Sequence, residues 1–390
     1  MDMQPDEALE LLKAGAAQII SEVELREKLA LGRPLRVKLG VDPTSPDIHL
    51  GHSIVLRKLR QFQDLGHQAI LIIGDFTGMI GDPSGRSTTR PHLTHKEVLA
   101  HAESYREQAF KILDPARTET VCNGDWFRTM SFEEVIRLNS RVTLQQILQR
   151  EDFRDRIDHQ QAVRAHEIQY PIMQGWDSVM VKADVELGGT DQLFNILVGR
   201  DFQREEGQAQ QVAFLLPLLE GLDGSRKMSK SFGNFIGVNE LAPEMFGKLM
   251  SISDELMERY YPLLLGRPIA ADANPLEAKK QLAVEIVEIY HSAEIAEKTL
   301  AKWNARFSQR RLADAELPEF PACDENVVTI VIAVYGQTFT TTKSRTEASR
   351  LIKQGSVQLD GKKIVDPKTT LSLRPGQILR LDKTHAVRIK

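Results

Sequence analysis

Several features that mark large protein classes are scarce or missing in this chain. Its 390 residues include only two cysteines, Cys122 and Cys323, which are far apart and belong to no CxxC motif. Neither a disulfide framework nor a cysteine zinc site is therefore supported, and a reducing cytoplasm is the expected compartment. No uncharged apolar run of about 18 residues occurs, which argues against a membrane span. The first seven residues are acidic, unlike a secretion signal or a transit peptide.

Two common nucleotide-binding signatures are also absent. The chain has no Walker A loop and no GxGxxG fingerprint, which argues against P-loop NTPases and dinucleotide enzymes. No carboxylate cluster marks a dedicated metal cage, so no protein-held metal is expected. What is present is length and apolar content: 390 residues with 42% hydrophobic side chains can form two or three domains with real cores.

Charge is distributed unevenly along the chain. The net charge is -4, but residues 343–390 carry 12 basic against 4 acidic side chains, which leaves the preceding residues strongly acidic. A small basic C-terminal region on an acidic body is typical of an RNA-binding appendage. From charge alone, a solvated surface without a ligand explains the pattern equally well.

The first two hundred residues alternate apolar runs with helical patterns. Runs at 35–41, 69–74 and 179–187 suit parallel strands that are buried on both faces, and the sequence therefore predicts a doubly wound α/β fold. Ligands in such sheets bind beyond the carboxyl ends of the strands. Three polar residues follow directly after these predicted strand ends: Asp42, His49 and Asp75.

Two short motifs carry the chemistry. His49-Leu50-Gly51-His52 supplies two imidazoles and a residue without a side chain at a helix start, where a flat base can pack against the backbone. Lys227-Met228-Ser229-Lys230-Ser231 supplies two cations on a loop, which suits a polyphosphate. Each motif alone is more often a helix cap or a solvated loop, but the two in this order resemble the class I aminoacyl-tRNA synthetases, and their surroundings resemble the tyrosyl branch.

This resemblance implies a reaction in which a carboxylate attacks the α-phosphate of ATP and pyrophosphate leaves, so the protein must gather positive charge rather than supply a nucleophile. It implies that His49, His52, Lys227 and Lys230 are catalytic, with adenine over Gly51, Asp191 at the ribose and Mg²⁺ accompanying ATP. The full set of ATP-binding residues that it implies is Asp42, Thr44, Gly51, Arg86, Arg90, Gly189, Asp191, Met228, Ser229 and Ser231.

The amino-acid pocket is predicted on the helix that contains Gln169 to Asp177. Tyr170, Gln174 and Asp177 follow each other at spacings of four and three, on one helix face. The resemblance implies that Asp177 accepts a hydrogen bond from the phenol of tyrosine. It also places Tyr170, Gln174 and Asp82 around the ammonium group and Gln192 at the carboxylate.

One position departs from the pattern of many family members. Lys38 stands four residues before Asp42, where a tyrosine that contacts the substrate phenol is common. A cation there needs an acidic partner, for which Asp75 and Asp177 are the candidates, and all three are assigned to the tyrosine pocket. We expect Lys38 to mark a subgroup with a rearranged pocket floor.

The resemblance extends over nearly the whole chain and implies its domain organisation. Residues 1–232 form a Rossmann-like catalytic domain, with a dimer-forming insertion around 125–165, and residues 233–320 form a helical domain on the anticodon side. A linker at 321–334 leads to a small α+β domain at 335–390 that resembles the S-four-like RNA-binding domain named after a ribosomal protein. In that domain a basic helix over 342–355 precedes an Asp-Gly hairpin and a strand over 373–381, and four cations are expected to contact RNA: Lys343, Arg345, Arg350 and Lys353.

The expected function is that of a homodimeric, cytoplasmic tyrosine-tRNA ligase that needs no membrane. It activates L-tyrosine with ATP and transfers the tyrosyl group to the terminal adenosine of its tRNA. The amphipathic stretch over 132–153 is the expected dimer surface, although such stripes are more often ordinary core faces. Three alternatives remain open: a tryptophanyl synthetase, a nucleotidyltransferase with an HxGH turn, and a noncatalytic RNA-binding or splicing factor on a synthetase scaffold.

Overall fold

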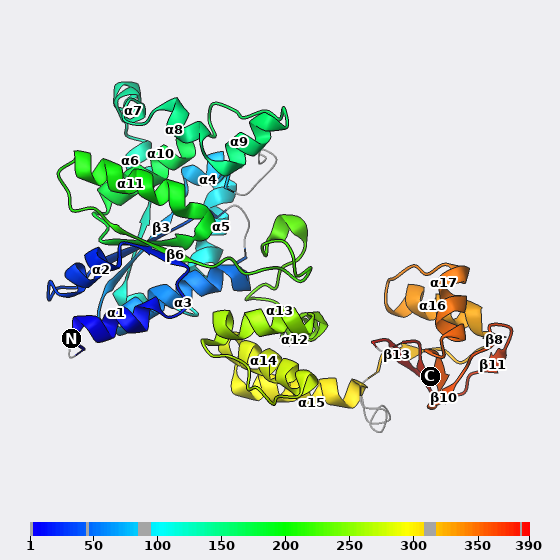
Figure 1. Ribbon diagram of the computed structural model, residues 1–390. Helices are drawn as coiled ribbons and strands as arrows, with labels where there is room; N and C mark the ends of the chain where they lie inside the picture. The colour runs from blue at the N-terminus through cyan, green and yellow to red at the C-terminus, as the bar shows by residue number, and fades with distance from the viewer. Residues whose placement is uncertain (1–2, 44–46, 85–94, 308–316, 383) are drawn as a thin grey trace. The chain divides into compact units, whose positions relative to one another are not determined.

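The computed structural model describes residues 3–43, 47–84, 95–307, 317–382 and 384–390. The chain forms two compact units, Met1–Tyr290 and His291–Lys390, each with its own core (Figure 1). Within the described ranges, no helix is long and apolar enough to cross a membrane.

A six-stranded sheet organises the first unit. Its strand order is β1-β6-β5-β2-β3-β4, in which β2 to β6 run parallel and β1 pairs antiparallel with β6 at one edge. Apolar residues fill β3 and β6, whose side chains are almost entirely buried, as expected for strands covered on both faces. The strands are β1 (Gln18–Ile20), β2 (Arg36–Val41), β3 (Gln68–Ile73), β4 (Thr118–Cys122), β5 (Val185–Gly189) and β6 (Val212–Leu216).

Helices cover both faces of this sheet, which confirms the predicted doubly wound α/β fold. Figure 1 shows α1 and α3 on one face and α10 and α11 on the other. The bounds of these and neighbouring helices are α1 (Pro5–Lys13), α2 (Glu22–Leu29), α3 (Leu50–Asp64), α4 (Thr77–Ile80), α5 (His95–Ala109), α10 (Gln169–Met180) and α11 (Leu193–Glu205).

The strand order creates one favourable place for a ligand. The chain leaves β2 toward α3 on one face and leaves β5 toward α11 on the other, although β2 and β5 are neighbours (Figure 1). A crevice opens beyond the carboxyl ends of two strands whose connections diverge in this way. The HxGH turn begins α3 and therefore lies at this crevice.

One predicted strand is wrong in its extent. Residues 179–187 were expected to be extended, but α10 continues to Met180, and a turn at Lys182, whose φ is 50°, leads to β5 at Val185. Val179 and Val181 are buried against helical and sheet side chains rather than in a strand. A short apolar run does not distinguish the end of a buried helix from a strand.

The region around 125–165 forms four short helices, α6 (Gly124–Phe127), α7 (Phe132–Asn139), α8 (Leu144–Leu148) and α9 (Glu151–Asp158). Leu138, Ile147 and Phe153 are buried against side chains of α10 and α11. Phe132 and Ile136 are 78% and 55% exposed instead. The amphipathic stretch therefore has one face in the core and one apolar face on the surface.

The first unit ends in a helical part. It consists of α12 (Ala242–Ser251), α13 (Asp254–Tyr260) with a continuing turn at Tyr261–Leu265, and α14 (Pro275–Tyr290). Leu282 and Ile286 of α14 are fully buried. The boundary between the two units, at His291, falls inside the helical domain that the sequence predicted at 233–320.

The second unit contradicts the predicted linker. Residues 321–334 contain a short strand and most of α16, whose side chains Val327, Val331 and Val334 are completely buried in the core of this unit. The eight residues from Val327 to Val334 are nearly all apolar, and they form an ordered core helix rather than a linker. The elements begin with α15 (Ala293–Phe307), β7 (Glu319–Phe320), β8 (Asp324–Asn326) and α16 (Val327–Thr338).

The predicted basic helix and hairpin follow. The helix, α17 (Arg345–Lys353), is capped by Ser344, and Asp360 and Gly361 take the positive φ values of a tight hairpin turn, 47° and 81°. The strand expected over 373–381 is shorter than predicted and consists of β12 alone, Ile378–Arg380. The remaining strands are β9 (Gln358–Leu359), β10 (Lys362–Lys363), β11 (Thr370–Ser372), β12 (Ile378–Arg380) and β13 (Ala386–Ile389).

Candidate active site

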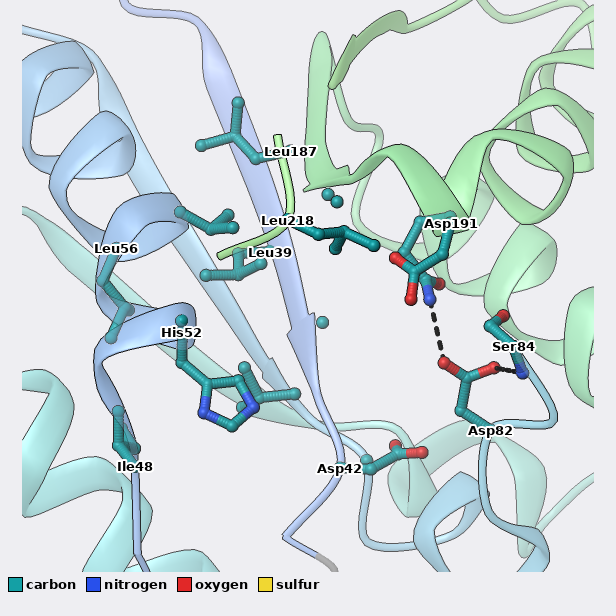
Figure 2. Close-up of a pocket in the computed structure, with 18 of the residues that line it drawn as sticks. Leu39, Asp42, Ile48, His52, Leu56, Asp82, Ser84, Leu187, Asp191 and Leu218 are labelled. Carbon is teal, nitrogen blue, oxygen red and sulfur yellow. Dashed lines mark hydrogen bonds between the residues drawn. The ribbon is translucent and has the colours of Figure 1, made fainter. Parts of the chain in front are cut away.

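A pocket of about 300 Å³ opens at the carboxyl ends of β2 and β5, as the strand order requires. Figure 2 shows His52 and Leu56 on one side of it and Asp82, Ser84 and Asp191 on the other. The predicted residues that line it are Asp42, His49, Gly51, His52, Asp82, Tyr170, Gln174, Asp177, Gly189, Asp191, Gln192, Lys227, Met228, Ser229, Lys230 and Ser231. Thr44, Arg86 and Arg90 lie outside the described residues.

The HxGH turn places its two imidazoles together at the start of α3. The rings of His49 and His52 stack with centroids 3.8 Å apart, and His52 Nδ1 accepts a hydrogen bond from the backbone N–H of His49 at 3.3 Å. Burial lowers the pKa of His49 well below its usual value, and the nearby charges of His52, Lys230 and Lys227 lower it further. A Cβ on Gly51 would stand 3.0 Å from the His49 ring, so a side chain there would crowd the pocket wall.

The two lysines of the second motif face the pocket and are already paired with acids. Lys227 Nζ lies 2.7 Å from Asp191 Oδ2 and donates to the Ser84 carbonyl oxygen at 3.2 Å. Lys230 Nζ donates to the backbone carbonyl of Asp47 and lies 3.5 Å from its carboxylate. Burial lowers the pKa of Lys230, and Asp47 opposes this effect. A bound anion would therefore replace partners that these cations already have.

A short hydrogen-bonded group holds Asp42 at the end of β2. Asp42 Oδ1 accepts from the Thr77 hydroxyl at 2.8 Å, and Thr77 in turn accepts from Asn123 Nδ2 at 2.9 Å. A Cβ on Gly74 would come within 2.0 Å of Asp42 Oδ1, so this contact requires glycine. The carboxylate of Asp42 is thereby fixed at the pocket edge (Figure 2).

Amide side chains link the other side of the pocket. Gln192 Nε2 donates to Asp82 Oδ2 at 2.8 Å, and Asp82 Oδ1 accepts from the Ser84 N–H at 2.9 Å, the contact drawn in Figure 2. Burial raises the pKa of Asp82, but the hydrogen bonds from Ser84 and Gln192 and the charge of Arg150 outweigh burial, so the pKa falls below its usual value. Asp82 is therefore a fixed negative charge.

Asp177 is the acid at the bottom of the pocket. Its Oδ1 accepts from Trp126 Nε1 at 2.9 Å and its Oδ2 from Asn123 Nδ2 at 3.2 Å. Burial raises the pKa of Asp177 to about 7, although the charge of Lys38 and these two donors act in the opposite direction. Near neutral pH the carboxylate can still accept a further hydrogen bond, since it has about four acceptor positions.

The predicted partners of Lys38 are wrong. Its ammonium is completely buried and contacts Glu186 Oε1 at 2.9 Å, the Ser178 hydroxyl at 2.7 Å and the Gln174 carbonyl oxygen at 2.9 Å. All three N–H donors are thus used inside the protein, and Lys38 does not line the pocket. Glu186 lines it instead, directly opposite Lys38 in the β2–β5 ladder.

Asp75 is also misplaced by the sequence prediction. Its carboxylate pairs with Arg128 at 2.8 Å and accepts from the Gly124 N–H at 2.7 Å, and it does not line the pocket. It connects β3 to the start of α6. Its position after a strand end suggested a pocket residue, but the side chain turns toward the neighbouring strand connection.

Sequence reasoning missed several residues of the site. Glu186 is a charged residue within an apolar strand, a signal that was available. Trp126 and Asn123 follow β4, which was not predicted, and Asp47 carried no recognisable signal. These four residues all contact groups that line the pocket.

The four cations predicted to bind RNA belong to the second unit. Arg345, Arg350 and Lys353 are exposed on α17. Lys343 is partly buried, 3.8 Å from Glu347 and over the ring of Tyr335. Three of the four are therefore accessible to a phosphate.

We expect Lys38→Met to destabilise the first unit strongly, because it leaves the Glu186 carboxylate buried without its cation. The expected loss is about 3–5 kcal/mol in the free energy of unfolding, measured with urea. Adding Glu186→Gln to this variant removes the unpaired charge and should restore most of the loss. If Lys38→Met alone has the same free energy of unfolding as the wild-type protein, the ion pair does not stabilise the first unit and the prediction is wrong.

Comparisons with known proteins identify the family of the chain. A profile of the family described as "tRNA synthetases class I (W and Y)" matches residues 30–313. The tyrosine-tRNA ligase of Moorella thermoacetica is 48% identical over 396 residues, which cover 98% of this chain and 95% of that protein. The ligase of Oleidesulfovibrio alaskensis is 49% identical over 403 residues, covering 100% and 99%.

Solved structures share the fold at lower identity. The tyrosyl-tRNA synthetase of Archaeoglobus fulgidus, complexed with L-tyrosine, has a TM-score of 0.61 and 22% identity, covering 76% of this chain and 99% of that one. A truncated mitochondrial tyrosyl-tRNA synthetase of Aspergillus nidulans has a TM-score of 0.64 and 21% identity, covering 78% and 94%. Because the family profile spans most of the chain and the relatives match it from end to end, the chain belongs to the tyrosyl-tRNA synthetases, within the class I family of tryptophan and tyrosine enzymes.

Proposed function

We propose that this protein is a tyrosine-tRNA ligase that forms tyrosyl-adenylate from L-tyrosine and ATP and then transfers the tyrosyl group to its tRNA. The observation that carries the proposal is a single pocket with two chemically different regions. One region gathers His49, His52, Lys227 and Lys230, and the other has the buried acid Asp177. These regions match the two substrates of adenylate formation.

The cationic region suits the phosphates of ATP. As the tyrosine carboxylate attacks the α-phosphate, negative charge shifts to the leaving pyrophosphate, and preorganised donors stabilise that charge. Lys227 and Lys230 exchange Asp191 and Asp47 for phosphate oxygens. Asp191, once released, can accept from a ribose hydroxyl. His49, with its lowered pKa, is neutral near pH 7 and contacts the phosphates as a hydrogen-bonding group.

The acidic region suits tyrosine. Asp177 accepts the phenol hydrogen in addition to its bonds from Trp126 and Asn123. A substrate without that hydroxyl leaves this further acceptor position of the buried carboxylate unpaired, and tyrosyl synthetases are a general example of how strongly such a substrate, phenylalanine, is rejected. Asp82, Tyr170 and Gln174 surround the ammonium, and Gln192 meets the carboxylate. Lys38 contributes by holding Glu186 rather than by touching the substrate.

Magnesium normally accompanies ATP, but the chain offers it no cage. The parts of the chain that the structure describes contain no group of three or more His, Cys, Asp and Glu side chains placed to hold a metal ion. Among the described residues, the groups placed to contact the phosphates are imidazole and ammonium groups, and a magnesium ion would enter with ATP on its phosphate oxygens.

The transfer step requires tRNA. We propose that the second unit provides part of the tRNA-binding surface. Arg345, Arg350 and Lys353 form an exposed basic face on α17 that can contact RNA phosphates without reading bases. We propose the cytoplasm as the compartment of the enzyme.

The surface of the α7–α8 segment supports a homodimer. Phe132, Ile136 and Leu144 are 78%, 55% and 54% exposed, and three large apolar side chains on neighbouring short helices are typical of a protein interface. Since the opposite face of the same helices is buried in the first unit, a second copy of this chain is the occupant that we propose. The resulting contact would be isologous.

Amino-acid-dependent exchange of labelled pyrophosphate into ATP tests the activity. We expect exchange with tyrosine alone among the twenty amino acids, and Lys230→Ala should lower kcat by about 10²–10³-fold because it removes a cation from the developing charge. Lys298→Ala, at an exposed lysine that pairs with Glu294, is the matched control. Exchange with tryptophan would contradict the role of Asp177, and no exchange would favour a noncatalytic RNA-binding protein.

Tyrosine binding should depend on pH through Asp177. With a pKa of about 7, the carboxylate is increasingly protonated below neutral pH and loses an acceptor for the phenol. The KM for tyrosine should therefore rise as pH falls from 8 to 6, by about tenfold at most per pH unit below 7. Asp177→Asn should abolish this dependence, while the KM for ATP should not follow it in either protein.

Ile136→Asp should convert the dimer to a monomer, because it places a charge in the centre of the apolar surface. Sedimentation equilibrium measures the change. Val23→Asp, at a position that is 66% exposed on α2, is the matched control and should leave the association state unchanged. A monomeric wild-type protein at micromolar concentration would contradict the proposed interface.

A further inference from the structure

Arg150 is a buried cation beside the pocket; its charge helps to keep Asp82 ionised, but the mechanism above does not use its hydrogen bonds. It lies between α8 and α9, is 5% exposed and does not line the pocket. Its guanidinium contacts Asp152 at 3.0 and 2.9 Å and Ser84 Oγ at 3.0 Å, and it also donates to Asn195 Oδ1. Phe153 and Phe194 pack against it, with ring centroids 5.0 and 5.5 Å away.

The hydrogen bond from Arg150 fixes which way the side-chain amide of Asn195 faces. A guanidinium can only donate hydrogen bonds, so the carbonyl oxygen of Asn195 must face Arg150 and its NH₂ group must face away. That NH₂ group donates to Gln174 Oε1 at 2.9 Å and to Gln192 Oε1 at 3.0 Å. Asn195 is 1% exposed, so no solvent compensates for a reversed amide.

The orientation of Asn195 in turn fixes the side-chain amides of Gln174 and Gln192. Because their oxygens accept from Asn195, their NH₂ groups face two acids: Gln174 donates to Glu186 at 3.1 Å and Gln192 to Asp82 at 2.8 Å. Ionised carboxylates only accept. These hydrogen bonds form one series, which we call the amide series. It begins at Arg150, which can only donate, and ends at Glu186 and Asp82, which accept. Reversing any one amide would place donor against donor or acceptor against acceptor.

The fixed orientation of the two glutamine amides leaves particular donor and acceptor positions free for the substrate. Each glutamine NH₂ has two hydrogens, of which one is used, and the second hydrogen on Gln192 can meet the tyrosine carboxylate. The second lone pair of Gln174 Oε1 can accept from the tyrosine ammonium. A rotated amide would present the wrong atom to either charged group.

We propose that Arg150 is a positioning residue that fixes the amide orientation of Gln174 and Gln192 through Asn195 and thereby sets the affinity for tyrosine. The inference rests on the proposed tyrosine-tRNA ligase activity and adds a determinant that does not touch the substrate. It acts on the amino-acid side of the pocket and leaves the ATP side unchanged.

Two variants of the full-length protein test whether Arg150 and Asn195 orient the two glutamine amides. Both are measured by pyrophosphate exchange. Arg150→Met removes the donors, and Asn195→Asp keeps an acceptor for Arg150 but has no NH₂ to give to the glutamines. Both should raise the KM for tyrosine by about 10- to 100-fold, with the KM for ATP within about twofold of wild type. Arg150→Lys retains a donor and should raise the KM for tyrosine less than Arg150→Met.

Arg156→Met is the matched control for a purely structural role. Arg156 is also buried on this segment, where it pairs with Glu167 at 2.8 and 2.9 Å and packs on the ring of Phe153, but among the described residues it has no hydrogen bond to Asn195, Gln174 or Gln192. It should lower the unfolding midpoint without changing the KM for tyrosine. If Arg150→Met does not fold, Asn195→Asp decides the question by itself.

The outcomes separate this inference from the proposed function. A wild-type KM for tyrosine in Asn195→Asp would overturn the inference, and so would an equal rise in Arg156→Met. Absence of tyrosine-dependent exchange in the wild-type protein would instead overturn the proposed function.

Discussion

The buried ion pair between Lys38 and Glu186 is the interaction on which the pocket depends. The two residues are directly opposite each other on β2 and β5, the neighbouring strands between which the crevice opens, and they are 0% and 1% exposed. Neither charge is tolerable alone at such depth. The register of two central strands is therefore linked to the arrangement of the pocket floor, because a slip of one strand by one residue would separate the charges and turn that strand's charged side chain to the other face.

Hydrogen bonds from two further elements converge on the acid of this pair. Glu186 accepts from Ser178 and Gln174 of α10 and from Gln211 at the start of β6. The helix that provides Asp177 and Tyr170 is thus connected to the strands by polar contacts inside the protein. Although Gln211 Oε1 has no hydrogen-bond partner among the described residues, buried polar contacts of this kind favour one arrangement of their members, which a purely apolar interior would not.

The cationic side of the pocket is organised differently. Lys227 and Lys230 contact Asp191 and Asp47, so each of these ammonium groups has an acidic partner within the protein. Binding of a polyphosphate is then an exchange of anionic partners. The cost of that exchange is smaller than the cost of desolvating two free ammonium groups, because both are already partly removed from water.

Much of the fold could be predicted from local patterns, and the failures have physical causes. The strands at 36–41 and 68–73, the HxGH turn and the lysine loop have signals within a few residues, and all of them occur where they were expected. The partner of Lys38 could not be found in the same way, because ladder register between distant segments decides it. The segment 321–334 was taken for a linker because the prolines before it obscured an apolar helix.

The same limits apply to the candidate site. Gln174 and Asp177 were found because they share one helix face, whereas Trp126, Asn123 and Asp47 contact the site from separate connections whose course the sequence does not reveal. Asp75 shows the opposite error, since a position after a strand end does not determine the direction of the side chain.

The fixed direction of the amide side chains has a consequence for attempts to redesign this enzyme for other amino acids. Replacing Gln174 or Gln192 alters more than the shape of the pocket, because the new side chain must accept from Asn195 and donate to an acid at the same time. Hydroxyl and imidazole side chains can also donate and accept, but only glutamine and asparagine carry an acceptor oxygen and an NH₂ group on one planar amide. Combinatorial libraries at these positions would therefore gain more viable members if Asn195 and Arg150 were varied together with them.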